Sequence, residues 1–195
     1  KSVLDLYAVH TNPRVIMSTQ STLILDGHLD LAYNALFHRR DLTQDVYTLR
    51  EREDPRPPGP SHPDSLRERK RQESPAKGTA TVSLSEMRLG HVGIVLSTIM
   101  SRVQMPTQTL DDGARTQLAA HAQGQAHLHY YKALERAGLL RFIRTVEDLD
   151  ASLLDWSNPS SEPPFGLILS MESADPILGP EQVGWWHDQG LRSVG

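Results

Sequence analysis

The chain reads Thr-Leu-Ile-Leu-Asp-Gly-His-Leu-Asp-Leu at residues 22–31, an apolar run that leads into three polar residues at alternate positions. This alternation predicts a β-strand, because side chains two residues apart on a strand point to the same face. We expect a buried strand that projects Asp26, His28 and Asp30 together. One imidazole and two carboxylates suit zinc or a similar divalent ion, which enzymes use to activate water. The alternative is an ion network without a metal.

The composition limits the class of protein. A chain of 195 residues with 38% hydrophobic content can bury a substantial core. The formal charge of −4 gives no electrostatic reason for a nucleic-acid partner, and no apolar run reaches the roughly 18 residues of a membrane span. Cysteine is absent, so any metal must be held by nitrogen and oxygen ligands. The same absence fits a reducing compartment, and we expect a cytoplasmic protein.

The chain then alternates between patterns typical of helices and strands. Residues 50–77 interrupt this order, because they hold six of the thirteen prolines and a dense mixture of both charges. We interpret them as a polar, Pro-rich insertion or loop rather than a binding patch. Elsewhere we expect helices over residues 32–40, 83–90, 111–137, 145–154 and 180–189, and strands over residues 91–98, 165–171 and 191–195.

The longest expected helix, over residues 111–137, has a regular stripe at three- and four-residue spacing. We expect this stripe to face the core, and its members are Leu118, Ala122, Ala126, Tyr130, Leu134 and Ala137. His127 and His129 lie two residues apart and would face different directions on a helix. We interpret both as residues of the polar face and not as metal ligands.

The strand over residues 165–171 is apolar on both faces, as in a parallel sheet covered by helices, and it leads directly to Glu172. Alternating strands and helices predict a parallel sheet with right-handed crossovers. No Gly-rich phosphate loop follows the first strand, whereas ionisable residues follow two separate strands. We therefore prefer an α/β fold of the (β/α)₈ TIM-barrel type to a doubly wound sheet. The chain carries about the first four strands of such a barrel.

Four segments together resemble the membrane (renal) dipeptidase family of zinc peptidases, in the metal-dependent hydrolase superfamily. They are Asp26-Gly-His-Leu-Asp-Leu, Gly90-His-Val-Gly, Ser170-Met-Glu-Ser-Ala-Asp-Pro-Ile and Gly190-Leu-Arg-Ser-Val-Gly. The resemblance implies that residues 1–195 are the N-terminal half of a single metal-dependent-hydrolase barrel. The segment over residues 50–77 is the clearest departure, since family members typically have less material there.

The resemblance also implies a binuclear zinc site that hydrolyses dipeptides. His28 and Asp30 match the ligands of one ion, and Glu172 matches a carboxylate that bridges two ions around a hydroxide nucleophile. For Asp26, a hydrogen bond to a metal ligand or packing inside the barrel is as compatible with the resemblance as direct ligation of the metal. Related hydrolases with other substrates more often have His-x-His on this strand, so His28-Leu-Asp30 favours the dipeptidases.

The family's remaining histidine ligands, its substrate-binding arginine and its acid–base aspartate would lie beyond Gly195. We therefore expect a partial chain that is inactive alone. A non-catalytic barrel that serves as a binding or scaffolding protein stays open as an alternative, as does another metal-dependent amidohydrolase. The sequence leaves open which dipeptides are cleaved, which metal is native, and whether the protein is a monomer or a homodimer.

Overall fold

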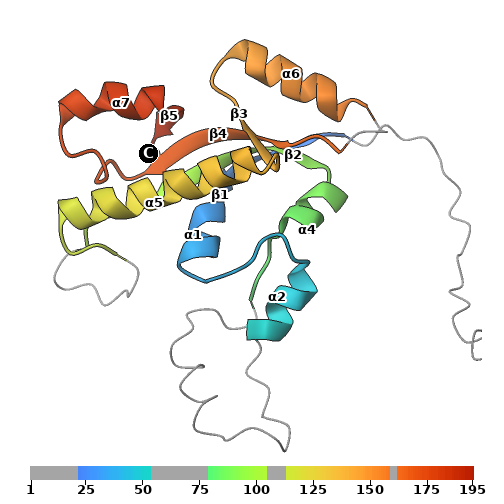
Figure 1. Cartoon of the computed structure of the whole chain (residues 1–195), viewed down its shortest axis with the longest axis horizontal. Helices are drawn as coiled ribbons and strands as arrows, with labels where there is room; N and C mark the ends of the chain where they lie inside the picture. Colours follow the sequence, from blue (N-terminus) through green and yellow to red (C-terminus); the bar gives the residue numbers. More distant parts are fainter. Residues whose placement is uncertain (1–21, 54–78, 105–112, 159–161) are drawn as a thin grey trace, which may run out of the picture.

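A parallel sheet lies at the centre of the computed structural model, which describes residues 22–53, 79–104, 113–158 and 162–195 (Figure 1). The strands are β1 (Ile24–Leu29), β2 (Val92–Met100), β3 (Leu140–Phe142), β4 (Phe165–Glu172) and β5 (Leu191–Val194). The helices are α1 (Leu31–Leu36), α2 (Val46–Glu53), α4 (Leu84–Leu89), α5 (Gln117–Arg136), α6 (Val146–Trp156), the 3₁₀ turn η1 (Pro180–Gln182) and α7 (Val183–Asp188). The predicted mixed α/β fold with a parallel sheet is confirmed.

The strands β1, β2 and β4 are neighbours in that order, and β4 also pairs with two further strands. The short strand β3 lies along the first residues of β4, where Leu140 is paired with Phe165. The strand β5 lies along the last residues of β4, where Leu191 is paired with Leu169. The sequence did not predict β3, because three residues are too few for a periodic pattern. The other four strands were predicted.

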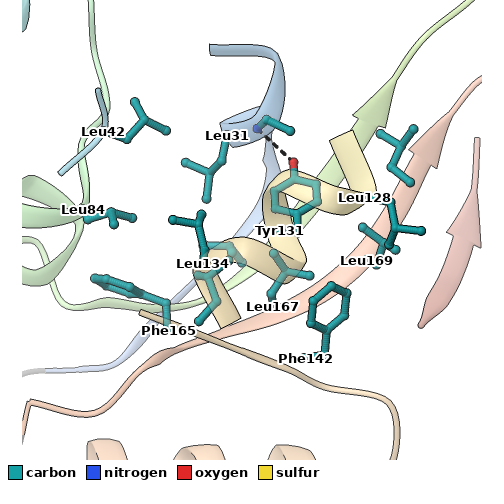
Figure 2. Packing of buried hydrophobic residues seen from close by; sticks show 14 of the residues in the cluster. Leu31, Leu42, Leu84, Leu128, Tyr131, Leu134, Phe142, Phe165, Leu167 and Leu169 are labelled. Carbon is teal, nitrogen blue, oxygen red and sulfur yellow. Dashed lines mark hydrogen bonds between the residues drawn. The ribbon is translucent and has the colours of Figure 1, made fainter. Parts of the chain in front are cut away.

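Helix α5 covers one face of the sheet (Figures 1 and 2). On that face, the register of β2 with β4 places Val95 beside Leu167 and Ile99 beside Met171, and all four are buried in the core. The opposite face carries the alternate residues of the same strands, among them Thr98 beside Ser170 and Met100 beside Glu172. Glu172 therefore lies on the face away from the α5 core.

The expected core stripe of α5 is wrong for most of its members. Leu118 is 71% exposed, and the buried face consists of Ala120, Gly124, His127, Leu128, Tyr131 and Leu134. The predicted stripe was rich in alanine, which buries little surface, whereas the observed face carries larger side chains. Gly124 allows α5 to lie close to the segment that follows β4, since a Cβ at this position would lie 2.8 Å from the ring of Pro176. The start of the helix also differs, because Thr116 caps it by accepting a hydrogen bond from the amide of Ala119.

The strand β1 is more exposed than the apolar pattern predicted. Ile24 and Leu25 are 46% and 55% exposed, because β1 pairs with β2 alone among the described strands and α5 packs over β2.

Of the predicted loop over residues 50–77, residues 50–53 belong to α2 and the remainder lies outside the described residues. Among the helices that the structure describes, none has the length and apolar character needed to cross a membrane.

A buried tyrosine hydroxyl joins three elements at the end of the sheet. Tyr131 of α5 has no exposed surface, and its hydroxyl donates a hydrogen bond to the carbonyl of Thr98 at 2.7 Å. The same oxygen accepts a hydrogen bond from the amide of Ala32 at 3.2 Å (Figure 2). Helix α5 is thereby fixed to β2 and to the first turn of α1.

Replacement of Tyr131 by Phe should destabilise the protein by about 1–3 kcal/mol, because the buried amide of Ala32 and the carbonyl of Thr98 each lose a partner. Urea denaturation measures this free energy of unfolding. The control is Tyr47→Phe at a tyrosine that is 68% exposed, where we expect a change within about 0.5 kcal/mol. Equal stability of the two variants would contradict the role given to the Tyr131 hydroxyl.

Candidate metal centre

Three of the predicted site residues meet at one end of the sheet. His28 lies near the end of β1, Asp30 follows that strand, and Glu172 ends β4. The Nε2 atom of His28 is 3.5 Å from Oδ2 of Asp30 and 3.7 Å from Oε2 of Glu172, and one ligand atom of each residue lies within 4.8 Å of the others. Residues about 140 positions apart in sequence are thus neighbours in space.

Asp26 does not join this group, because the strand β1 contains a bulge. Between Asp26 and Leu29 the chain advances three residues while β2 advances two, from Val95 to Ser97. The extra residue interrupts the alternation of faces, so Asp26 points to the same face as Leu29. Its carboxylate accepts a hydrogen bond from the amide of His28 at 3.0 Å. The expectation that three polar side chains share one face is therefore wrong for Asp26.

The side chains of the cluster are accessible to solvent, so a dissolved ion can reach them. The side chains of His28, Glu172 and Asp30 are 58%, 41% and 26% exposed. Glu172 is held at the end of the ladder between β2 and β4, and the next residue, Ser173, turns the chain with a φ of 70°. The carboxylate therefore extends from a fixed strand end rather than from a loop.

The spacing of the donor atoms fits a divalent ion. Two ligand atoms about 2.1 Å from one tetrahedral zinc ion lie about 3.4 Å apart. The separations of 3.5 and 3.7 Å from the His28 nitrogen are close to that value. A nitrogen with carboxylate oxygens is also a donor set that zinc accepts. His28, Asp30 and Glu172 can therefore contact one ion after small side-chain adjustments.

The backbone of Asp30 is fixed by a series of polar contacts. Asn34 donates two hydrogen bonds to the Asp30 carbonyl, from its backbone and its side chain, at 2.9 and 2.8 Å. Arg40 donates to the Asn34 side chain at 2.5 Å and pairs with Glu53 at 2.6 Å. Burial raises the pKa of Glu53, but the hydrogen bond and charge of Arg40 outweigh it and hold this pKa below its usual range. The series connects α2 to the site.

His127 is a buried residue that the sequence analysis assigned to the polar face. It is 6% exposed, and its Nδ1 accepts a hydrogen bond from the amide of Met100, beside Glu172 in the sheet register. Burial lowers the pKa of His127 to about 4, although the charge of Asp30 acts in the opposite direction. The neutral imidazole of His127 thus accepts a hydrogen bond from the last residue of β2. In the sequence, His127 lies one, four and seven residues before Leu128, Tyr131 and Leu134, and this helical spacing was the signal that His127 is buried.

Comparisons with known proteins show a likeness in fold to a solved structure. No family model and no curated protein sequence matches the chain. Among solved structures, the chain is similar to the crystal structure of dipeptidase AC, a metallopeptidase of family M19, with 20% identity and a TM-score of 0.56. The match covers 90% of this chain and 42% of the other. This likeness supports the relationship in fold that the sequence motifs implied, and at this identity it shows the fold alone.

The buried His127 should make stability depend on pH. Its pKa is about 4 in the folded state against about 6.5 in the unfolded chain, so below pH 6.5 the unfolded chain binds the proton first. The folded state should lose up to about 3 kcal/mol as the pH falls from 6.5 to 4. In His127→Asn, an amide oxygen replaces the acceptor and this loss should disappear.

Urea denaturation at several pH values between 7 and 4 measures the difference between the wild type and His127→Asn. His129→Asn, at an exposed histidine of the same helix, should keep the pH dependence of the wild type. Parallel curves for the wild type and His127→Asn would show that His127 titrates alike in both states.

Proposed function

We propose that the protein is a metal-dependent hydrolase that cleaves dipeptides. The observation that carries this proposal is the meeting of His28, Asp30 and Glu172 at the carboxyl ends of β1 and β4. The likeness in fold to a metallopeptidase supports it. Each of the three residues offers a donor that zinc accepts, and the absence of cysteine leaves nitrogen and oxygen as the available donors.

We further propose that the sheet is part of a TIM-type barrel. The strands β1, β2, β4 and β5 are neighbours in the same order as they follow in the chain, as in a barrel, whereas a doubly wound sheet reverses its order. The short strand β3 is an addition beside the start of β4. The chain spans 42% of the length of the dipeptidase structure that it matches. On this proposal, residues 1–195 correspond to the first half of a single barrel domain.

The proposed site would hold two zinc ions. His28 and Asp30 would be ligands of one ion, and Glu172 would be a ligand of both. Bound divalent ions supply an acidified water and a Lewis acid that polarises the peptide carbonyl. The role of the chain is to fix the donors: β4 holds Glu172, and Asn34 restrains the backbone of Asp30. The negative charge of the two carboxylates favours cation binding.

Zinc binding should depend on the three ligands. Glu172→Gln and His28→Ala should each weaken zinc affinity by more than about tenfold. Even the loss of a group that only hydrogen-bonds to a ligand typically lowers metal affinity about 10- to 100-fold. Competition with a chromophoric chelator measures the affinity. The matched control is Glu51→Gln, an exposed glutamate of α2 outside the cluster, which should bind zinc like the wild type. Unchanged affinity in both site variants would refute the proposed centre.

Dipeptide hydrolysis should require the metal. The full-length protein should cleave dipeptides, lose activity with a chelator and regain it with zinc. Glu172→Gln should reduce kcat/KM by at least about a hundredfold, whereas Glu51→Gln should not change it. Liberated amino acids provide the readout across a panel of dipeptides of both stereochemistries. Zinc binding without hydrolysis of any dipeptide would favour a non-catalytic relative, and hydrolysis of other amides alone would favour a different amidohydrolase.

A further inference from the structure

The buried residue Thr98 contacts the site from the neighbouring strand. It is 2% exposed and lies in β2 on the sheet face that also carries Glu172. Its hydroxyl donates a hydrogen bond to Oδ1 of Asp30, while Oδ2 of Asp30 faces the His28 nitrogen at 3.5 Å. The two oxygens of one carboxylate thus have different partners, one behind the site and one within it.

Asp30 also occupies the N-cap position of α1, where an aspartate normally accepts hydrogen bonds from the amides of the first turn. Its side chain makes no such bond here. The carboxylate therefore has two competing orientations, one toward the helix amides and one toward His28. The hydrogen bond from Thr98 favours the second orientation.

We propose that Thr98 is a positioning residue that holds the Asp30 carboxylate toward His28 and Glu172 for cation binding; this inference rests on the metal site proposed above. The Thr98 backbone is itself fixed, because its carbonyl accepts the hydrogen bond from the buried Tyr131 hydroxyl. A donor fixed in this way restricts rotation of the carboxylate before the ion arrives. Less conformational freedom is then lost on binding, so the affinity is higher.

The test uses zinc alone as the ligand and measures its affinity by competition with a chelator. Thr98→Val keeps the shape of the side chain and removes the hydroxyl, so we expect zinc to bind about 10- to 100-fold more weakly. Thr98→Ser restores the donor and should bind within about threefold of the wild type. A residue that only filled space would show the opposite order, because Val preserves the packing and Ser does not.

Thr43→Val is the matched control. It removes another hydrogen bond from a threonine hydroxyl to an aspartate, between Thr43 and Asp41 at 2.6 Å, outside the three-residue cluster. Its zinc affinity should equal that of the wild type. Urea denaturation of every variant shows whether it is folded, and Thr98→Ala replaces Thr98→Val if valine is not accommodated.

The outcomes separate the two proposals. Wild-type affinity in a folded Thr98→Val or Thr98→Ala variant would overturn the role of Thr98 and leave the metal site intact. Equal weakening in Thr98→Ser and Thr98→Val would also overturn it, because the hydroxyl would then not matter. Failure of the wild-type protein to bind zinc would overturn the proposed function itself.

Discussion

The arrangement of the site depends on the hydrogen bonds of one buried hydroxyl, that of Tyr131. Its position in the interior is possible because Thr98 and Ala32 satisfy both its donor and its acceptor capacity. Since Thr98 in turn contacts Asp30, the long helix α5 is connected to the site by two successive hydrogen bonds. The apolar packing around Tyr131 fixes the distance between α5 and the sheet, and the hydroxyl fixes the position of the helix along the strands.

Local signals in the sequence predicted much of the fold. The expected helices over residues 83–90 and 145–154 begin at Ser83 and Thr145, which cap α4 and α6, and Gly190 follows the last helical segment with a φ of 113°. These features are encoded by a few neighbouring residues, so they are visible without the tertiary structure. The alternating elements also sufficed for a parallel sheet. Strand β3 depends instead on its pairing with Phe165, which a local pattern does not contain.

The site could be predicted in part for the same reason. His28, Asp30 and Glu172 follow strong strand patterns, so their positions at strand ends were visible in the sequence. The bulge that turns Asp26 away is set by pairing with β2. Thr98 is an unremarkable residue of an apolar strand, and its importance follows from its contact with Asp30. The predicted metal ligation of the three residues stays a prediction until zinc binding is measured.

The uncapped first turn of α1 implies a conflict between stability and function. An N-cap hydrogen bond typically stabilises a helix by about 1 kcal/mol, and α1 forgoes the bond that its own Asp30 could make. Serine or asparagine at this position could supply the cap, but either would remove the carboxylate from the cluster and leave the buried Thr98 hydroxyl without this acceptor. The Asp30 carboxylate therefore adds to stability through β2 rather than through its own helix, and a substitution that strengthens the first turn of α1 would loosen the contact between α1 and the sheet.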